Sequence, residues 1–281
     1  LPEPPGVACL ASDDVEAEVR HATTSGARLA VSTPGAMGRA IRSGLAAISG
    51  LQVVAIDEAD ALLADGGGGE SESEAMGEVT TLLEAIGCAR ARPPQLILTM
   101  ATLNPAQDAA VRARFPSARR VSHAGVLPPT LRQSFQLIPH GSKQPHLLQL
   151  LRDSAADQWL GQGGTMVFCA EEKVARELHT LLANADDAWL RGLSPGLLTE
   201  GTPVRQRSRI LNAVREGECG LLVCTDVASR GLDFPQMRHV IMYDLPDDAA
   251  KFIHRAGRTA RVGREGHVTC LVQSHEVEQC R

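Results

Sequence analysis

Short apolar runs alternate with segments of helical length along this 281-residue chain. The runs are rich in β-branched and aliphatic residues and predict strands at residues 28–32, 52–56, 95–100, 133–138, 165–169, 220–225, 239–243 and 268–272. The segments between them predict helices at residues 13–21, 38–48, 74–86, 105–114, 171–185 and 204–216. Alternation of this kind is typical of a parallel sheet covered by helices, and several runs are apolar throughout, as in strands buried on both faces. The predicted fold class is α/β.

The length of the chain predicts about two domains. Residues 116–129 contain Pro-Pro, Gly and Ser without a regular period, which favours a linker, and we place it at residues 121–131. One domain then occupies residues 1–120 and the other residues 132–281. Apolar runs such as residues 53–56 are far shorter than the ~20 residues that cross a bilayer, so we expect no membrane partner.

Composition limits how this chain can bind nucleic acid. The formal net charge is −5 at pH 7, and five Phe, two Trp and one Tyr are too few for a row of base-stacking side chains. A nucleic-acid site must therefore be a local groove that contacts the backbone. The seven cysteines form no Cys-x-x-Cys pair and have no His at zinc-ligand spacing, which predicts buried free thiols in a reducing, intracellular compartment.

The apolar run at residues 53–56 is followed directly by Asp57-Glu58-Ala59-Asp60. Acids at the carboxyl end of a strand lie where open α/β sheets bind ligands. One carboxylate there can hold a hydrated Mg²⁺ on nucleotide phosphates, and its neighbour can orient or deprotonate the attacking water. A buried strand followed by a solvated acidic turn is the alternative interpretation.

Four arginines recur every three residues, at Arg255, Arg258, Arg261 and Arg264. On a helix their guanidinium groups would lie along one side, where like charges repel each other unless anions face them. Phosphoryl oxygens suit planar guanidinium groups, so the row is a candidate phosphate site, and a solvated basic helix face is the alternative. Gly257 suggests that the row bends at the start of a helix.

A third apolar run, residues 222–224, opens into the polar segment Thr225-Asp226-Val227-Ala228-Ser229-Arg230-Gly231-Leu232-Asp233. A hydroxyl, an arginine and backbone amides near a glycine can bind sugar-phosphate, and an acid can hold a ribose hydroxyl. This signal is weak alone, because many strands open into polar loops.

These three motifs, with Thr33-Pro34-Gly35 upstream and Gln206-x-x-Arg209 among them, closely resemble the DEAD-box family of ATP-dependent RNA helicases. Asp57-Glu58-Ala59-Asp60 spells the motif that names the family. The resemblance covers nearly all of the chain and implies two RecA-like domains, each a mostly parallel sheet flanked by helices. It implies ATP and Mg²⁺ as cofactors and RNA, as a single strand or short duplex, as the partner. We further expect a monomer that works with protein cofactors.

The resemblance also implies roles for individual residues. Those implied in catalysis or nucleotide binding are Asp57, Glu58, Asp60, Gly231, Asp233, His254, Arg258 and Arg261. Among them, Asp57 would coordinate Mg²⁺ and Glu58 would position the hydrolytic water. Asp60 and His254 would link the motifs across the cleft between the domains. Arg258 and Arg261 resemble arginine fingers on the γ-phosphate, and Asp233 resembles a ribose contact.

The residues that match the family's contacts to the RNA backbone are Thr33, Pro34, Gly35, Gln206, Arg209, Thr225 and Arg230. Contact with the backbone implies binding that is independent of sequence and weakens with salt. The family's coupling motif Ser-Ala-Thr is replaced by Met100-Ala101-Thr102, which loses a hydroxyl. Ala36 stands where the family has an arginine, and the nearest one is Arg39. Ala260 replaces a usual glycine, and we expect it to keep the same helical backbone.

No Gly-x-x-x-x-Gly-Lys-Ser/Thr loop occurs in these 281 residues, and Gly141-Ser142-Lys143-Gln144 is the nearest approach. That loop and its lysine hold the β and γ phosphates. We therefore expect an amino-terminally truncated chain, with residues 1–120 forming the carboxyl-terminal part of the first domain, and no ATP hydrolysis by this chain alone. The alternatives are a non-catalytic RNA- or protein-binding module on a helicase scaffold, and a DNA-directed helicase.

Overall fold

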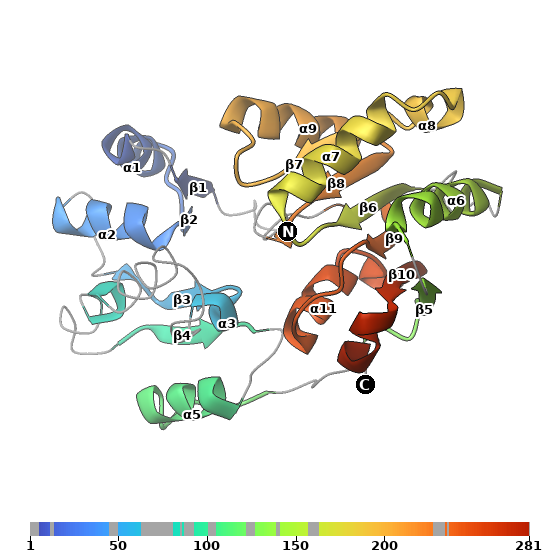
Figure 1. Cartoon of the computed structure of the whole chain (residues 1–281). Helices are drawn as coiled ribbons and strands as arrows, with labels where there is room; N and C mark the ends of the chain where they lie inside the picture. The colour runs from blue at the N-terminus through green and yellow to red at the C-terminus, as the bar shows by residue number, and fades with distance from the viewer. Residues whose placement is uncertain are drawn as a thin grey trace. The chain divides into compact units, whose positions relative to one another are not determined.

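The computed structural model divides into two compact units, Leu1–Val121 and Ser122–Arg281, and each is described by itself. The structure describes residues 6–11, 14–44, 50–62, 81–84, 86, 93–100, 105–121, 127–138, 141–156, 163–226, 234 and 236–280. Figure 1 shows the elements in chain order. The helix predicted at residues 74–86 lies largely outside the described residues.

Among its described residues, the first unit contains two pairs of parallel strands and four helices. The strands are β1 (Val7–Leu10) paired with β2 (Leu29–Ser32), and β3 (Val53–Ile56) paired with β4 (Gln95–Leu98). The helices are α1 (Val15–Thr24), α2 (Pro34–Arg42), α3 (Ala59–Leu62) and α5 (Pro105–Arg114). A small core forms where α1 and α2 pack against Leu10. No residue of β2 or β3 is buried, with Val31 at 56% and Val53 at 47% exposure, so the expectation of burial on both faces is wrong for these strands.

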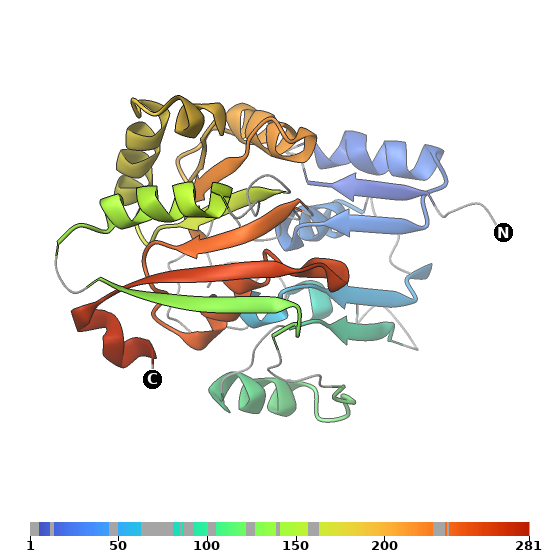
Figure 2. The ribbon, with the colours of Figure 1, turned by 90° about the vertical axis from the view of Figure 1, so that its right-hand side faces the viewer.

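The second unit is built on a six-stranded sheet in which every pairing is parallel. The strands are β5 (Leu131–Ile138), β6 (Gly164–Phe168), β7 (Gly196–Leu198), β8 (Leu221–Cys224), β9 (Met237–Met242) and β10 (Gly266–Gln273), in the spatial order β5-β10-β9-β6-β8-β7. The helices are α6 (Lys143–Ala156), α7 (Glu172–Ala183), α8 (Ala188–Gly192), α9 (Val204–Glu216) and α11 (Ala249–Ala256), with 3₁₀ turns η3 (Arg261–Gly263) and η4 (Ser274–Cys280). Figure 2 shows the strands of this sheet side by side.

Helices cover both faces of this six-stranded sheet. Residues of α6, α7 and α8 pack with Val167 on one face, and residues of α9 and α11 pack with Phe168 on the other. The strands β6 and β8 are buried along their whole length, which confirms the prediction of strands buried on both faces. Such a sheet presents the carboxyl ends of its parallel strands at one edge, where ligands bind in this fold class.

Most predicted elements are present with small shifts at their ends, and α5 and α9 have the predicted bounds. The predictions missed β1, β7, α3, α6, α8 and α11, and placed the start of α2 at residue 38 instead of Pro34.

Among the described cysteines, Cys9 is exposed and Cys169, Cys219, Cys224 and Cys270 are buried, all as free thiols. Burial raises the pKa of the Cys169 and Cys224 thiols. No helix among the described residues is long and apolar enough to span a bilayer.

Candidate functional site

The acidic motif of the first unit begins where β3 ends. Asp57 Oδ1 accepts hydrogen bonds from the backbone N–H of Glu58, at 3.0 Å, and from the Thr99 hydroxyl, at 2.5 Å. Thr99 directly follows β4, the parallel partner of β3, and its carbonyl accepts the N–H of Ala59 at 2.9 Å. Because parallel strands end at the same edge, the two loops meet there and hold the exposed Asp57 carboxylate in place.

Glu58 and Asp60 lie in two different environments. The backbone of Glu58 has a φ of +51°, a left-handed conformation that is strained for a residue with a side chain and is common at functional sites. Asp60 is only 4% exposed, and its carbonyl accepts a hydrogen bond from Gln107 of α5 at 3.2 Å. The motif therefore presents Asp57 and Glu58 near the surface and buries Asp60.

Thr33, Pro34 and Gly35 form the start of α2. The Thr33 hydroxyl caps the helix by accepting the N–H of Ala36 at 3.3 Å, and Pro34 occupies the first turn. Ala36, which stands in place of the family's arginine, is 1% exposed, whereas Arg39 is exposed one turn later. The hydrogen-bonding groups at this helix start can face an anion.

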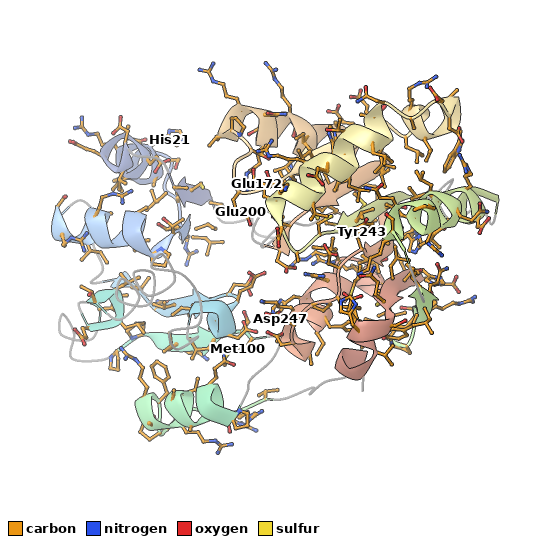
Figure 3. All side chains as sticks on the ribbon, viewed as in Figure 1. His21, Met100, Glu172, Glu200, Tyr243 and Asp247 are labelled. Atoms are coloured by element: carbon orange, nitrogen blue, oxygen red, sulfur yellow. The ribbon has the colours of Figure 1, made fainter. Side chains whose placement is uncertain are left out.

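The coupling motif is only partly described. Met100 follows Thr99 beyond β4 and is half-buried, and Figure 3 labels its side chain. Ala101 and Thr102 lie outside the described residues, as do Arg230, Gly231 and Asp233 of the third motif.

In the second unit, polar groups meet at the carboxyl edge of the sheet. Thr225 follows β8, is 2% exposed, and donates its hydroxyl to the Glu200 carboxylate at 3.0 Å. Glu200 follows β7, and the neighbouring Gly201 N–H donates to Glu172 of α7 at 3.3 Å (Figure 3 labels both glutamates). In this structure the Thr225 hydroxyl therefore donates to Glu200.

Hydrogen bonds of Arg255 connect the carboxyl ends of β8 and β9, and a further bond of Asp244 connects them to the end of β6. The Arg255 guanidinium group donates two hydrogen bonds of 2.7 Å to the Asp226 carboxylate and one of 2.6 Å to the Asp244 carbonyl. Asp244 in turn accepts the N–H of Ala170, which follows β6, at 2.9 Å. Arg255 is 3% exposed, and all three of these hydrogen bonds go to groups of the second unit itself, so it acts as a buried structural cation.

The predicted arginine row is also interrupted by the end of a helix. The helix α11 ends at Ala256 with Gly257 as its C-cap, so Gly257 marks a helix end and not the predicted start. Beyond it, Arg258 is 7% exposed and donates from Nε to the His254 carbonyl at 3.3 Å. Arg261 donates from Nε to the Gly257 carbonyl at 2.7 Å. These bonds orient the two guanidinium groups on a turn at the carboxyl end of α11.

Ala260 does not keep a helical backbone, so that expectation is wrong. Its φ of +54° and ψ of +29° are left-handed, a conformation that glycine adopts freely and that costs other residues about 1–2 kcal/mol. The turn also passes close to Gly266, where an added Cβ would lie 2.5 Å from the Ala260 nitrogen. Replacement of the family's glycine by Ala260 therefore places strain between Arg258 and Arg261.

Gln206 and Arg209 both lie on α9. They are three residues apart and exposed, so they share one face of the helix, where they can contact a polyanion together.

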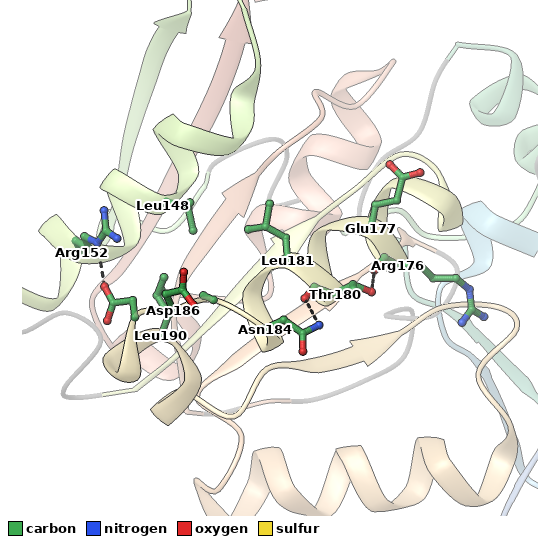
Figure 4. Close-up of a pocket in the computed structure, with 11 residues that line it drawn as sticks. Leu148, Arg152, Arg176, Glu177, Thr180, Leu181, Asn184, Asp186 and Leu190 are labelled. Carbon is green, nitrogen blue, oxygen red and sulfur yellow. Dashed lines mark hydrogen bonds and ion pairs between the residues drawn. The ribbon is translucent and has the colours of Figure 1, made fainter.

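A separate groove lies on the surface of the second unit (Figure 4). It has a volume of about 820 Å³ and is lined by residues of α6, α7 and α8, including Leu148, Leu181 and Leu190. Arg152 and Asp187 form an ion pair of 3.1 Å at its side. None of the predicted site residues lines this groove, so it is distinct from the motifs.

The comparisons with known proteins agree with the motifs. Residues 143–263 match the family model described as "Helicase conserved C-terminal domain". The chain is 33% identical over 263 residues to the ATP-dependent RNA helicase dbp8 of Aspergillus fumigatus. This match covers 88% of the chain and 46% of that protein. Over 266 residues it is 34% identical to the ATP-dependent RNA helicase dbp-8 of Neurospora crassa, with 89% and 39% covered. The chain belongs to the DEAD-box family of RNA helicases.

The fold agrees with solved DEAD-box structures. S. cerevisiae Dbp5 bound to RNA and ADP BeF3 matches with a TM-score of 0.69 at 23% identity, over 96% of this chain and 72% of that one. This likeness confirms the RecA-like α/β fold. The chain spans less than half of the length of the two dbp8 relatives. The sequence of this DEAD-box chain did not predict two contacts, that of Arg255 with Asp226 and that of Thr99 with Asp57. No local sequence pattern marks either pair.

Proposed function

We propose that the full-length gene product is an ATP-dependent RNA helicase that binds the RNA backbone without sequence preference and separates short duplexes by ATP hydrolysis. The observation that carries this proposal is the acidic motif at the end of β3, with Asp57 held by two donors and Glu58 in a strained conformation. Its relatives are named ATP-dependent RNA helicases, and Dbp5 was solved with RNA and ADP BeF3.

The acidic motif fits a magnesium ion that arrives with its nucleotide. Among the described residues, no group of three or more His, Cys, Asp or Glu side chains can hold a metal by itself. Mg²⁺ is usually held by one or two carboxylates together with substrate phosphates, and Asp57 supplies one such carboxylate. When bound, Mg²⁺ neutralises charge on the phosphates during transfer. Asp57 would hold the hydrated ion.

Glu58 would act on the water that attacks the γ-phosphate. Its carboxylate can accept a hydrogen bond from that water and orient it. It can then take up the water's proton as the new bond to the γ-phosphorus forms and the bond from that phosphorus to the ADP oxygen breaks. The left-handed backbone at Glu58 fixes the direction in which its side chain leaves the main chain. The carboxylate that orients the water is therefore positioned before the reaction.

Arg258 and Arg261 would stabilise charge on the transferred phosphoryl group. Guanidinium groups bind phosphoryl oxygens with paired hydrogen bonds, and both arginines are already oriented through Nε. The buried Arg255 and Asp226 pair would keep α11 fixed on the sheet beneath them. The link between Asp60 and His254 remains a prediction.

The RNA would be held through its phosphates by Thr33, Pro34 and Gly35 in the first unit and by Gln206 and Arg209 in the second. Helix starts and exposed arginines bind phosphate oxygens without reading bases. The shortage of aromatic residues in the chain agrees with this mode of binding.

These 281 residues contain no Gly-x-x-x-x-Gly-Lys-Ser/Thr loop. We therefore infer that hydrolysis needs a phosphate-binding loop beyond them. The same observation favours one other candidate, a non-catalytic RNA- or protein-binding module, should the gene product contain no such loop.

Strand separation distinguishes the two candidates. A short RNA duplex with a fluorescent strand is mixed with the full-length gene product, and release of that strand is followed with ATP or with a non-hydrolysable analogue. The helicase proposal predicts release with ATP only. RNA binding without release under either condition would favour the non-catalytic module.

A further inference from the structure

The contact between Thr99 and Asp57 links the ends of two neighbouring strands. The register pairs Ile56 with Leu98, so the residues that follow them meet at the same edge of the sheet. Thr99 is fixed there by its main chain, which donates to the Ile56 carbonyl at 3.0 Å and accepts the Ala59 N–H at 2.9 Å. Its hydroxyl therefore reaches Asp57 from a rigid position.

This contact determines which oxygen of the Asp57 carboxylate stays available. An ionised carboxylate only accepts hydrogen bonds, so the Thr99 hydroxyl must be the donor. Thr99 and the Glu58 N–H both donate to Oδ1, and no described residue donates to Oδ2. Two donors on one oxygen fix the rotation of the carboxylate and leave Oδ2 for a cation or its water shell.

The Thr99 hydroxyl lies one residue earlier in the sequence than the serine of the family's Ser-Ala-Thr motif. Met100 occupies the serine position and has no hydroxyl, whereas Thr99 supplies one that touches the acidic motif. We propose that Thr99 is a positioning residue, which orients the Asp57 carboxylate toward hydrated Mg²⁺ on the nucleotide. This inference rests on the proposed function of the acidic motif.

The test removes the hydroxyl and keeps the shape of the side chain. In the full-length gene product, Thr99→Val should raise the Mg²⁺ concentration for half-maximal ATP turnover by about tenfold, as loss of a partner to a metal-binding residue typically does. The same shift should appear in equilibrium binding of a fluorescent, non-hydrolysable ATP analogue titrated with Mg²⁺. Binding of the analogue in EDTA should not change.

Two further variants separate positioning from a general loss of structure. Thr99→Ser keeps the hydroxyl and should restore the wild-type magnesium dependence. Thr24→Val, at an exposed threonine of α1 whose hydroxyl bonds only to helix carbonyls, should leave it unchanged. An unchanged magnesium dependence in Thr99→Val, in a protein that hydrolyses ATP, would overturn this inference alone. Absence of ATP turnover in the wild-type protein would overturn the proposed function and the inference with it.

Discussion

Replacing Glu58 with glutamine in the full-length gene product should lower ATP turnover by about 10²–10⁴-fold, the usual contribution of a positioned general base. Glutamine has the same size but cannot take a proton from water. The left-handed backbone and the hydrogen bond from the Glu58 N–H to Asp57 involve no side-chain carboxylate of residue 58, so the variant should fold normally. RNA binding in the presence of ATP should persist, because it precedes hydrolysis.

Two measurements check this expectation. Phosphate release reports turnover, and fluorescence anisotropy of labelled RNA with ATP reports binding. Glu216→Gln, at the exposed end of α9, makes the same chemical change away from the motifs and should behave as wild type. Undiminished turnover in Glu58→Gln would remove Glu58 from the mechanism.

Arg255→Met should destabilise the second unit by about 3 kcal/mol. Breaking a buried ion pair typically costs about 3–5 kcal/mol, and the lower end applies because the Asp226 side chain is 26% exposed and regains some hydration. The substitution also removes the donor to the Asp244 carbonyl, so the ends of β8 and β9 lose their shared anchor. Replacing both partners by apolar residues, as Arg255→Met with Asp226→Leu, should recover part of the loss.

Urea unfolding of the whole chain measures this effect. Trp189 lies in α8 of the second unit, so its fluorescence reports the unfolding of that unit. Arg132→Met is the matched control, because Arg132 pairs with Glu265 at 4.0 Å on the surface and such pairs contribute about 0–1 kcal/mol. Equal effects of Arg255→Met and Arg132→Met would contradict a structural role for the buried pair.

The parallel sheet of the second unit could be predicted because its strands are buried on both faces. Continuous apolar runs such as residues 221–224 are distinctive, and α9 begins and ends where its sequence predicts. The helix α6 was missed since its first residue, Lys143, is a cation at a helix start, which is unfavourable by itself. Glu276 neutralises it at 2.9 Å, more than a hundred residues later in the chain.

The candidate site residues were predicted from motifs, but their environments could not be. The contact of Thr99 with Asp57 and the pairing of Arg255 with Asp226 join residues 42 and 29 positions apart, and each depends on which strands are neighbours. The period of three in the arginines suggested one helix face, whereas α11 ends at Ala256 and buries Arg255. Local spacing cannot reveal a helix end set by packing against a sheet.

The most direct test of the helicase proposal compares ATP turnover by the full-length gene product with RNA and with DNA of the same sequence. We expect strong stimulation by RNA, little by DNA, and no turnover with either by these 281 residues alone. Equal stimulation by both nucleic acids, or none by RNA, would contradict assignment as an RNA-dependent ATPase.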